Sequence, residues 1–377
     1  MPSIYIHIPF CKQACHYCDF HFSTSMAKKK MMISALKREM VLRREEIKDE
    51  VVETIYLGGG TPSVLETSEI NDLINTVYLN YQVVEKPEIT IEANPDDLSR
   101  EKLLQLAKSP INRLSIGVQS FFDEDLKFMN RAHNVKEALQ CIEEATMYFE
   151  NISIDLIYGI PEMTNDRWEQ NINKALSFGI PHISSYALTV EPKTALANFI
   201  KKGKVKPVDD EQSQKHFQIL YDVLTNEGYD CYEVSNFGKL GYYSKNNTAY
   251  WLGKKYMGFG PSAHSYDGGR RSWNINNNPK YLKAIAQDAL PMTTEILSKT
   301  DKYNEYIMTG LRTSWGISLE RIQTEFGNKY SRYLNQQIDK YIKQGLLVVS
   351  REQLVATRNG KFLVDGIASD LFVVNLD

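Results

Sequence analysis

The sequence predicts an α/β fold: an incomplete (β/α)6 barrel followed by a small α+β domain that resembles a winged helix. Short β-branched or apolar runs alternate with longer segments of helical period from residue 3 to about residue 190. This alternation is typical of repeated strand–helix units that form a parallel sheet. From about residue 296 the pattern becomes helical again and includes a short hairpin. A length of 377 residues also favours one large domain and a smaller one.

Each expected strand of the barrel is followed by a loop rich in Gly, Pro, Asn or Thr. The strands are expected at residues 3–8, 53–57, 88–92, 113–118, 153–158 and 182–188. Helices are expected between them at residues 26–50, 68–81, 100–108, 135–149 and 166–178, and a further amphipathic helix at 209–226. Six strand–helix units are too few to close a complete eight-stranded barrel.

The chain is expected to divide into three parts. Residues 1–228 form the core barrel, residues 229–295 form a connector or lid rich in Gly, Asn and Tyr, and residues 296–377 form the small domain. In that domain, helices are expected at 301–314, 319–326, 333–344 and 364–371, and hairpin strands at 346–349 and 354–357.

Composition narrows the class of protein. Apolar residues make up 42% of the chain and charged residues 24%, and the formal net charge is -3, so nothing indicates disorder or nucleic-acid binding. The run Lys28-Lys29-Lys30 opens a helix that soon carries acidic residues, which favours a solvated helix face. The sequence shows no long apolar stretch and no signal peptide. We therefore expect a cytoplasmic protein without a transmembrane segment; peripheral membrane contact stays open.

The most specific pattern is HIPFCKQACHYCDF at residues 7–20, directly after the first expected strand. Its C-x3-C-x2-C spacing places Cys11, Cys15 and Cys18 close together, and five cysteines in total do not form an even disulfide framework. Three thiolates can hold three irons of a 4Fe-4S cluster and leave the fourth iron open to another ligand. The alternatives are a zinc site completed by a nearby histidine, for which no second cysteine pair is present, or a chance grouping.

This spacing, followed by an aromatic residue, resembles the signature of radical S-adenosylmethionine (SAM) proteins. The resemblance implies that the amino and carboxylate groups of SAM bind the open iron. The run Gly58-Gly59-Gly60-Thr61-Pro62 follows the second expected strand, and its glycines would let the backbone approach such a ligand. A glycine triplet alone is weak evidence, because it also occurs in ordinary turns.

The resemblance extends, motif by motif, to the HemN/HemW group of radical SAM proteins. The matching segments are IEANP at 91–95, RLSIGVQSF at 113–121, NRAH at 130–133, DLIYGIP at 155–161 and YALTVEP at 186–192. The resemblance implies that Tyr5 lies near the cluster and that Gly59, Gly60 and Thr61 hold the amino-acid part of SAM. It further implies that the carboxylate, ribose or sulfonium region contacts Glu92, Gln119, Arg131 and Asp155, and that Ala187 lies near the adenine.

The residues themselves support a site at this edge of the sheet. Glu92, Gln119 and Asp155 end apolar strands, where a buried polar group needs a partner. A bound polar cofactor would supply partners. The alternative is a ring of ordinary salt bridges and strand-end caps, for example Arg131 with Asp155.

The segment DKYNEYIMTGLR at 301–312 resembles the HemN-type C-terminal domain. Within the group, oxygen-independent coproporphyrinogen III oxidases carry a further cysteine two residues after the third and a long amino-terminal extension. Here Phe20 occupies that position and Cys11 lies near the start of the sequence. Both differences favour the HemW-like branch, whose members are regarded as heme chaperones. The oxidase remains the alternative, so catalysis is left open, as are the heme acceptor and the electron donor.

A region for heme as a further ligand is expected within residues 229–273. HemW-like proteins often show a His-Asn-x-x-Tyr-Trp motif, whereas this chain has Asn246 in the histidine position, followed by Tyr250 and Trp251. A carboxamide is a poor ligand for heme iron compared with imidazole. The nearest substitute is His264, in GFGPSAHS at 258–265, although a histidine in such a loop more often forms hydrogen bonds.

Overall fold

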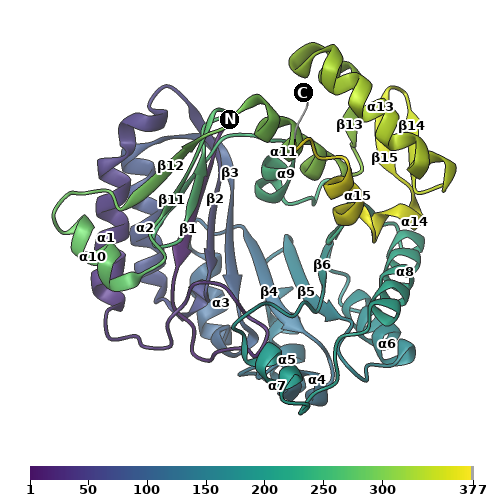
Figure 1. Ribbon diagram of the computed structural model, residues 1–377. Helices are drawn as coiled ribbons and strands as arrows, with labels where there is room; N and C mark the ends of the chain where they lie inside the picture. Colours follow the sequence, from purple (N-terminus) through teal and green to yellow (C-terminus); the bar gives the residue numbers. More distant parts are fainter. Residues whose placement is uncertain (375–377) are drawn as a thin grey trace.

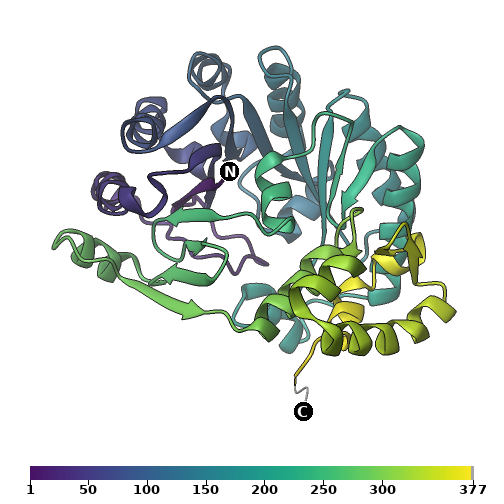
Figure 2. The same ribbon diagram turned by 90° about the horizontal axis from the view of Figure 1, so that it is seen from above.

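A single twelve-stranded sheet runs through most of the computed structural model, which describes residues 1–374 (Figure 1). Its order is β12-β11-β10-β9-β1-β2-β3-β4-β5-β6-β8-β7. The central six strands, β1–β6, are parallel neighbours, and helices cover their outer face (Figures 1 and 2). The predicted incomplete barrel is therefore confirmed.

The barrel alternates strands and helices in chain order. The strands are β1 (Ser3–Ile8), β2 (Val51–Gly59), β3 (Gln82–Ala93), β4 (Arg113–Gln119), β5 (Ile152–Tyr158) and β6 (His182–Ala187). The helices are α1 (Lys29–Leu42), α2 (Thr67–Asn80), α3 (Arg100–Ala107), α4 (Asp123–Phe128), α5 (Val135–Ala145), α6 (Asn165–Leu176), α7 (Ala195–Lys201) and α8 (Asp210–Asn226). All six predicted strands are present. The short helices α4 and α7 were not predicted.

Successive side chains of these strands point to opposite faces of the sheet. On β1, Ile4 and Ile6 are fully buried in the main hydrophobic core, whereas Tyr5 and His7 alternate with them. The alternation keeps apolar residues under the helices and places polar residues inside the barrel.

The segment predicted as a connector or lid adds strands to both edges of the sheet. β7 (Asp230–Glu233) and β8 (Asn236–Gly238) extend it beyond β6. β9 (Tyr256–Phe259) pairs in parallel with β1, and β10 (His264–Tyr266), β11 (Arg270–Asn274) and β12 (Met292–Ile296) continue as antiparallel strands. The helices α9 (Lys245–Trp251) and α10 (Asn278–Ile285) lie between them in the chain. The strands are three to five residues long, too short for a recognisable period.

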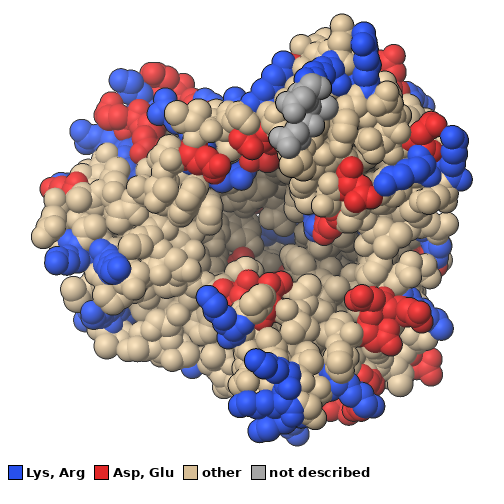
Figure 3. Space-filling view, in the orientation of Figure 1, with Lys and Arg blue, Asp and Glu red and all other residues tan. Residues whose placement is uncertain are grey.

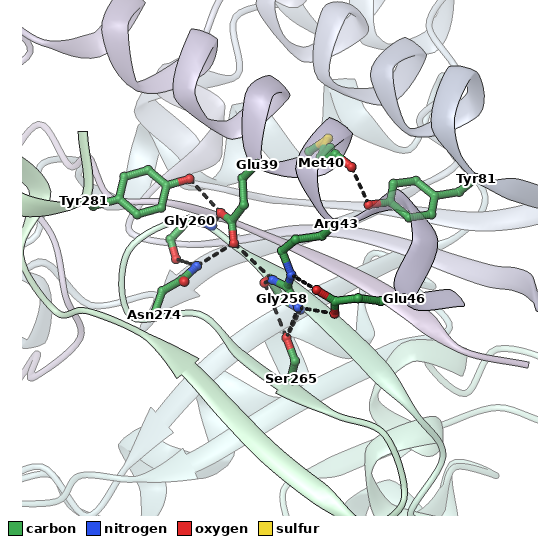
Figure 4. Close-up of polar contacts among 10 residues, drawn as sticks. All are labelled: Glu39, Met40, Arg43, Glu46, Tyr81, Gly258, Gly260, Ser265, Asn274 and Tyr281. Carbon is green, nitrogen blue, oxygen red and sulfur yellow. Dashed lines mark hydrogen bonds and ion pairs between the residues drawn. The ribbon is translucent and has the colours of Figure 1, made fainter. Parts of the chain in front are cut away.

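A buried ion pair fastens this added edge to α1 (Figure 4). Glu39 and Arg43 are fully buried, and Arg43 Nη1 lies 3.0 Å from Glu39 Oε1 and 2.7 Å from the carbonyl oxygen of Gly258. Glu39 also accepts hydrogen bonds from Asn274 Nδ2 and Tyr281 OH, both at 2.7 Å. Buried charges require such complete pairing.

Helix α1 ends at Leu42, so the predicted helix 26–50 is too long.

The C-terminal domain has its own hydrophobic core. It contains α11 (Lys299–Leu311), β13 (Ile317–Ser318), α12 (Leu319–Arg321), a π-helical turn (Ile322–Phe326), α13 (Asn328–Lys343), β14 (Leu347–Ser350), β15 (Gln353–Ala356), α14 (Arg358–Lys361) and α15 (Val364–Asp370). The antiparallel order β13-β15-β14 and the surrounding helices agree with the predicted α+β character. The backbone amide of Val234, which follows β7, donates to Arg312 O at 2.9 Å and joins the domain to the barrel.

Within residues 1–374, no helix is both long enough and apolar enough to cross a membrane.

Candidate functional site

The loop between β1 and α1 carries Cys11, Cys15 and Cys18, each partly exposed and free of disulfides. Hydrogen bonds tie the loop to the carboxyl-end side of the barrel: His16 N donates to the carbonyl oxygen of Met129 at 3.0 Å, beyond α4. The His16 carbonyl oxygen in turn accepts from Leu196 N of α7 at 2.8 Å. The loop is therefore fixed on both sides, with three thiols available to bind iron.

The surroundings of the thiols fit an anionic iron–sulfur cluster. Burial raises the pKa of the Cys11 and Cys18 thiols to about 11, so thiolates here need a cation such as iron. Arg131 places Nη1 3.4 Å from Cys15 Sγ, and its Nε is buried without a hydrogen-bond partner in the described structure. A guanidinium with a buried, unused donor suits a negatively charged group beside it. Thr61 Oγ1 donates to Cys11 Sγ at 3.3 Å.

The nearby histidines do not complete a zinc site. At least one ring nitrogen of each is hydrogen-bonded: His7 Nε2 lies 2.9 Å from the His21 carbonyl oxygen, and His21 Nε2 lies 2.7 Å from Asn278 Oδ1. His16 Nδ1 lies 2.9 Å from the carbonyl oxygen of Phe128. Across residues 1–374, no three His, Cys, Asp or Glu side chains form a group that could hold a single metal ion. A 4Fe-4S cube differs because it takes each thiolate on a separate iron.

The glycine turn after β2 packs directly on the start of the cysteine loop. Gly60 N donates to Ile8 O at 2.9 Å and Thr61 N donates to Phe10 O at 2.7 Å. A Cβ atom on Gly60 would lie 2.6 Å from the Phe10 carbonyl oxygen. Gly59 has φ +109°, which favours glycine. These glycines were expected to let the backbone approach a ligand, whereas at Gly60 the structure shows close contact between two backbone segments.

Two half-buried carboxyl groups face the inside of the barrel beyond this turn. Glu92 accepts hydrogen bonds from Tyr56 OH at 2.9 Å and from Gly59 N at 3.0 Å. Burial, reinforced by the nearby charge of Asp155, raises the pKa of Glu92 to about 7. Burial also raises the pKa of Asp155 to about 6, although Ser115 Oγ donates to this carboxyl at 3.2 Å. Both groups would be stabilised in their charged forms by a cationic ligand.

These carboxyl groups line a polar cavity of about 50 Å³. Its lining residues are Tyr56, Glu92, Arg113, Ser115, Asp155, Ser184, Tyr186, Ser244 and Asn247. Figure 3 shows that this face of the molecule is hollowed at its centre, where the strands in Figure 1 surround the barrel interior. The interior beside these carboxyl groups is therefore polar.

Gln119 and Arg131 lie where β4 ends. Gln119 has φ +68° and follows a register shift between β4 and β5, a conformation uncommon outside glycine. Arg131 Nη2 donates to Asn94 Oδ1 at 2.6 Å and to the Gly117 carbonyl oxygen at 2.8 Å. In residues 1–374 Arg131 forms no ion pair with Asp155, so the structural salt bridge considered as an alternative is not formed.

Tyr5 and Ala187 lie on strands on opposite sides of the barrel interior. The ring of Tyr5 stacks on Tyr56 at 6.1 Å between centroids, and its OH lies 3.1 Å from His7 Nδ1. Tyr56 therefore links Tyr5 to Glu92, because its ring stacks on Tyr5 and its OH donates to Glu92. Ala187 ends β6, where it pairs with Tyr158.

The four residues of the heme hypothesis lie on two elements, α9 and β10. Asn246 is buried on α9, where its Oδ1 accepts from Thr54 Oγ1 at 3.0 Å. The Trp251 ring lies under the Arg312 guanidinium, 5.0 Å from ring centroid to Cζ. His264 is exposed on β10 and stacks on Trp273 instead.

Tyr250, on α9 as well, is deeply enclosed. Burial raises the pKa of its hydroxyl above the usual range, and its ring packs edge-on against Tyr256 at 4.5 Å. Helix α9 therefore fills the barrel from the side opposite the cysteine loop.

Sequence reasoning missed several residues that line the cavity. Arg113 and Ser115 on β4, and Ser184 and Tyr186 on β6, occupy inward positions two residues apart. A period-two run of polar residues in an otherwise apolar strand was the signal that could have found them. Arg113, Ser115 and Tyr186 belong to recognised motifs but received no role, and the same holds for Asn94, the partner of Arg131.

The cysteine loop on an open parallel barrel defines a radical SAM protein. The model of the Radical SAM superfamily matches residues 5–175, and the HemN C-terminal domain model matches residues 297–363. Coproporphyrinogen III oxidase (HemN) from Escherichia coli has a similar structure, with a TM-score of 0.84 over 99% of this chain and 90% of that chain. The two sequences are 23% identical, so this similarity shows a shared fold and nothing about a shared activity.

Curated relatives match along nearly the full length. The heme chaperone HemW of Bacillus subtilis is 37% identical over 96% of this chain and 97% of that protein. HemW of Lactococcus lactis is 35% identical over 97% of this chain and 98% of that protein. The chain belongs to the HemW family of radical SAM proteins. Membership of the superfamily implies a 4Fe-4S cluster and SAM as cofactors.

Proposed function

We propose that this protein is a heme chaperone that carries a 4Fe-4S cluster and SAM, binds heme and transfers it to an acceptor protein. The observation that carries the proposal is full-length similarity to relatives named heme chaperone HemW. We further propose that it works in the cytoplasm.

We also propose roles for the residues around the cluster. Cys11, Cys15 and Cys18 each hold one iron, and Arg131 balances negative charge beside Cys15. When bound, the cluster supplies an open iron for the amino and carboxylate groups of SAM. The turn that contains Gly59, Gly60 and Thr61 positions the start of the cysteine loop.

The barrel interior receives the rest of SAM. Its polar groups form hydrogen bonds with Glu92, Gln119 and Asp155. Tyr5 supports Glu92 through Tyr56, and Ala187 borders the adenine. The cavity between β2 and β6 and the unusual backbone of Gln119 support this assignment.

SAM affinity should depend on pH through Glu92. Its pKa of about 7 means that lowering the pH from 8 to 6 neutralises the carboxylate, which then attracts the cationic groups of SAM less. We expect affinity to be about tenfold weaker at pH 6 than at pH 8, measured by titration calorimetry on cluster-loaded protein. Glu92→Gln should bind weakly at both pH values and lose most of this dependence. An equal pH dependence in the variant would contradict the role of Glu92.

Heme binding tests the proposed function. Titration of the purified, cluster-loaded protein with heme should show saturable binding near one heme per chain by absorbance spectroscopy. Heme should then pass to an apo-heme protein that binds it more tightly. Failure to bind heme would contradict the proposal.

The ligand to heme iron can be examined in the same titration. His264 is the exposed candidate, whereas Asn246 is enclosed. His264→Ala should alter the heme absorbance bands if this side chain binds the iron, and Asn246→Ala serves as the comparison. Identical spectra for His264→Ala and the unmodified protein would exclude His264 as the ligand.

A further inference from the structure

Asn94 directly follows β3 and lies between the residues that contact two of the three cysteine sulfurs. Its Oδ1 accepts from Arg131 Nη2 at 2.6 Å, and its Nδ2 lies 3.4 Å from Thr61 Oγ1. Thr61 Oγ1 in turn donates to Cys11 Sγ at 3.3 Å, and Arg131 Nη1 lies 3.4 Å from Cys15 Sγ. The side-chain amide of Asn94 therefore links the two groups that contact sulfur.

The chemistry of the three side chains sets the direction of these hydrogen bonds. The guanidinium of Arg131 has donors only, so Asn94 must turn its Oδ1 toward it. The amide nitrogen of Asn94 then faces Thr61 and donates to the hydroxyl oxygen. The hydroxyl proton of Thr61 is thereby left to point at Cys11 Sγ. One amide group thus orients both donors toward the cysteine sulfurs.

Asn94 is half-buried and is held in place by its surroundings. Its backbone amide donates to Ser63 Oγ at 3.2 Å, and Ser63 Oγ donates to Asp97 Oδ2 at 2.6 Å. A Cβ atom on Gly117 would lie 3.2 Å from Arg131 Nη2 and 3.4 Å from Asn94 Oδ1, so this pair packs directly on β4. The amide is therefore fixed between the glycine turn, the end of β3 and β4.

We propose that Asn94 is a positioning residue that keeps the Thr61 and Arg131 donors on the cysteine sulfurs and thereby raises the reduction potential of the 4Fe-4S cluster. One-electron reduction adds one negative charge beside these sulfurs, and no bond is made or broken. Donors directed at the sulfurs stabilise the added charge, and such hydrogen bonds help to set the potential of iron–sulfur clusters. The proposal rests on the three-cysteine ligation of the proposed function but not on heme transfer.

The alternative is a purely structural role, in which Asn94 only supports the loop after β3. Its removal would then lower the melting temperature or the iron content, and the cluster that remains would keep its potential. The reduction potential separates the two roles, because it responds to the charge around the sulfurs rather than to the stability of the fold.

The reduction potential of the full-length, cluster-loaded protein is measured by anaerobic redox titration with paramagnetic resonance as the readout. Asn94→Ala removes the amide from both donors, so we expect the ratio of reduced to oxidised cluster at a fixed potential to fall about tenfold. For one electron this equals a potential about 59 mV lower. Asn304→Ala is the matched control and should leave the potential unchanged. Asn304 is also half-buried, and its amide bonds both backbone groups of Val373 in the C-terminal domain.

A double-mutant cycle tests the path through Thr61. Thr61→Val keeps a β-branched side chain but removes the donor to Cys11, so it should lower the potential by itself. In the Thr61→Val background, Asn94→Ala should cause a smaller shift than in the unmodified protein, because only the Arg131 contact remains to be lost. Asn94→Asp keeps an acceptor for Arg131 but cannot donate to Thr61, so it gives the same comparison if the alanine variant does not retain the cluster.

Full iron content with an unchanged potential in Asn94→Ala would overturn the proposal and leave the cysteine assignment intact. Equal shifts from the Asn94 substitution in both backgrounds would also overturn it, because Asn94 would then not act through Thr61. The same would follow from an equal shift in Asn304→Ala. Absence of a cluster from the unmodified protein would contradict the cysteine ligation itself, and this proposal with it.

Discussion

Replacement of any one of Cys11, Cys15 or Cys18 by Ala should abolish the 4Fe-4S cluster. Each thiolate binds a different iron, so two remaining ligands cannot retain the cube. After anaerobic reconstitution, the unmodified protein should contain about four irons and four sulfides per chain and show a cubane-type paramagnetic resonance signal when reduced. The variants should contain little of either element.

The two other cysteines are matched controls. Cys141 lies in α5 and Cys231 in β7, both buried. Burial raises the pKa of the Cys141 thiol to about 12 and that of Cys231 to about 11, and neither belongs to the cysteine loop. Cys141→Ala and Cys231→Ala should keep full iron content. An intact cluster in Cys15→Ala would contradict the assignment.

Gly60→Val should produce the second large effect, loss of both cluster and SAM binding. The first added carbon would lie 2.6 Å from Phe10 O and 2.8 Å from Ile8 O, which are backbone atoms that cannot turn aside. The strain should cost about 1–3 kcal/mol and displace the start of the cysteine loop. Iron content, SAM affinity and melting temperature should all fall.

Gly366→Ala is the control for this substitution. Gly366 lies in α15, is exposed, and would place its new carbon in open space. Alanine favours helix, so the melting temperature should stay equal or rise. If Gly60→Val retained normal iron content and SAM affinity, the close contact between the turn and the loop would not matter for the site.

The local parts of this fold were predictable from the sequence. Each barrel strand contains a continuous apolar run, which can be recognised from residues that are adjacent in the sequence. All six strands were placed correctly for this reason. The start of β3 was predicted late, because residues 82–86 are exposed or half-buried and lack the apolar pattern. The cysteine loop was recognised because its ligands lie within eight residues.

Contacts between distant segments were not predictable in this way. Asn246 was assigned to a heme region, yet its hydrogen bond to Thr54 spans 192 positions of sequence. The partners of Arg131 are likewise distant, since Asn94 precedes it by 37 residues. The sheet edges of residues 230–296 are built from strands too short to show a period. Only folding brings these groups together.

Because the fold is similar to that of HemN, a coproporphyrinogen III oxidase, porphyrinogen decarboxylation is the activity that distinguishes the two functions considered. Radical decarboxylation of a porphyrinogen requires its propionate to be held next to the reacting carbon, and positioning can contribute about 7–11 kcal/mol to such a step. The oxidase pattern has a cysteine two residues after the third, where this chain has Phe20, a side chain that is 68% exposed. We therefore expect a heme carrier that does not act on coproporphyrinogen III.

The most direct measurement is an anaerobic assay of the cluster-loaded protein with coproporphyrinogen III, SAM and a low-potential reductant, with carbon dioxide and protoporphyrinogen as readouts. The same preparation is titrated with heme. We expect saturable heme binding and no carbon dioxide above the level of a Cys15→Ala control. Carbon dioxide and protoporphyrinogen formed over many turnovers would contradict the chaperone assignment and identify the protein as an oxidase.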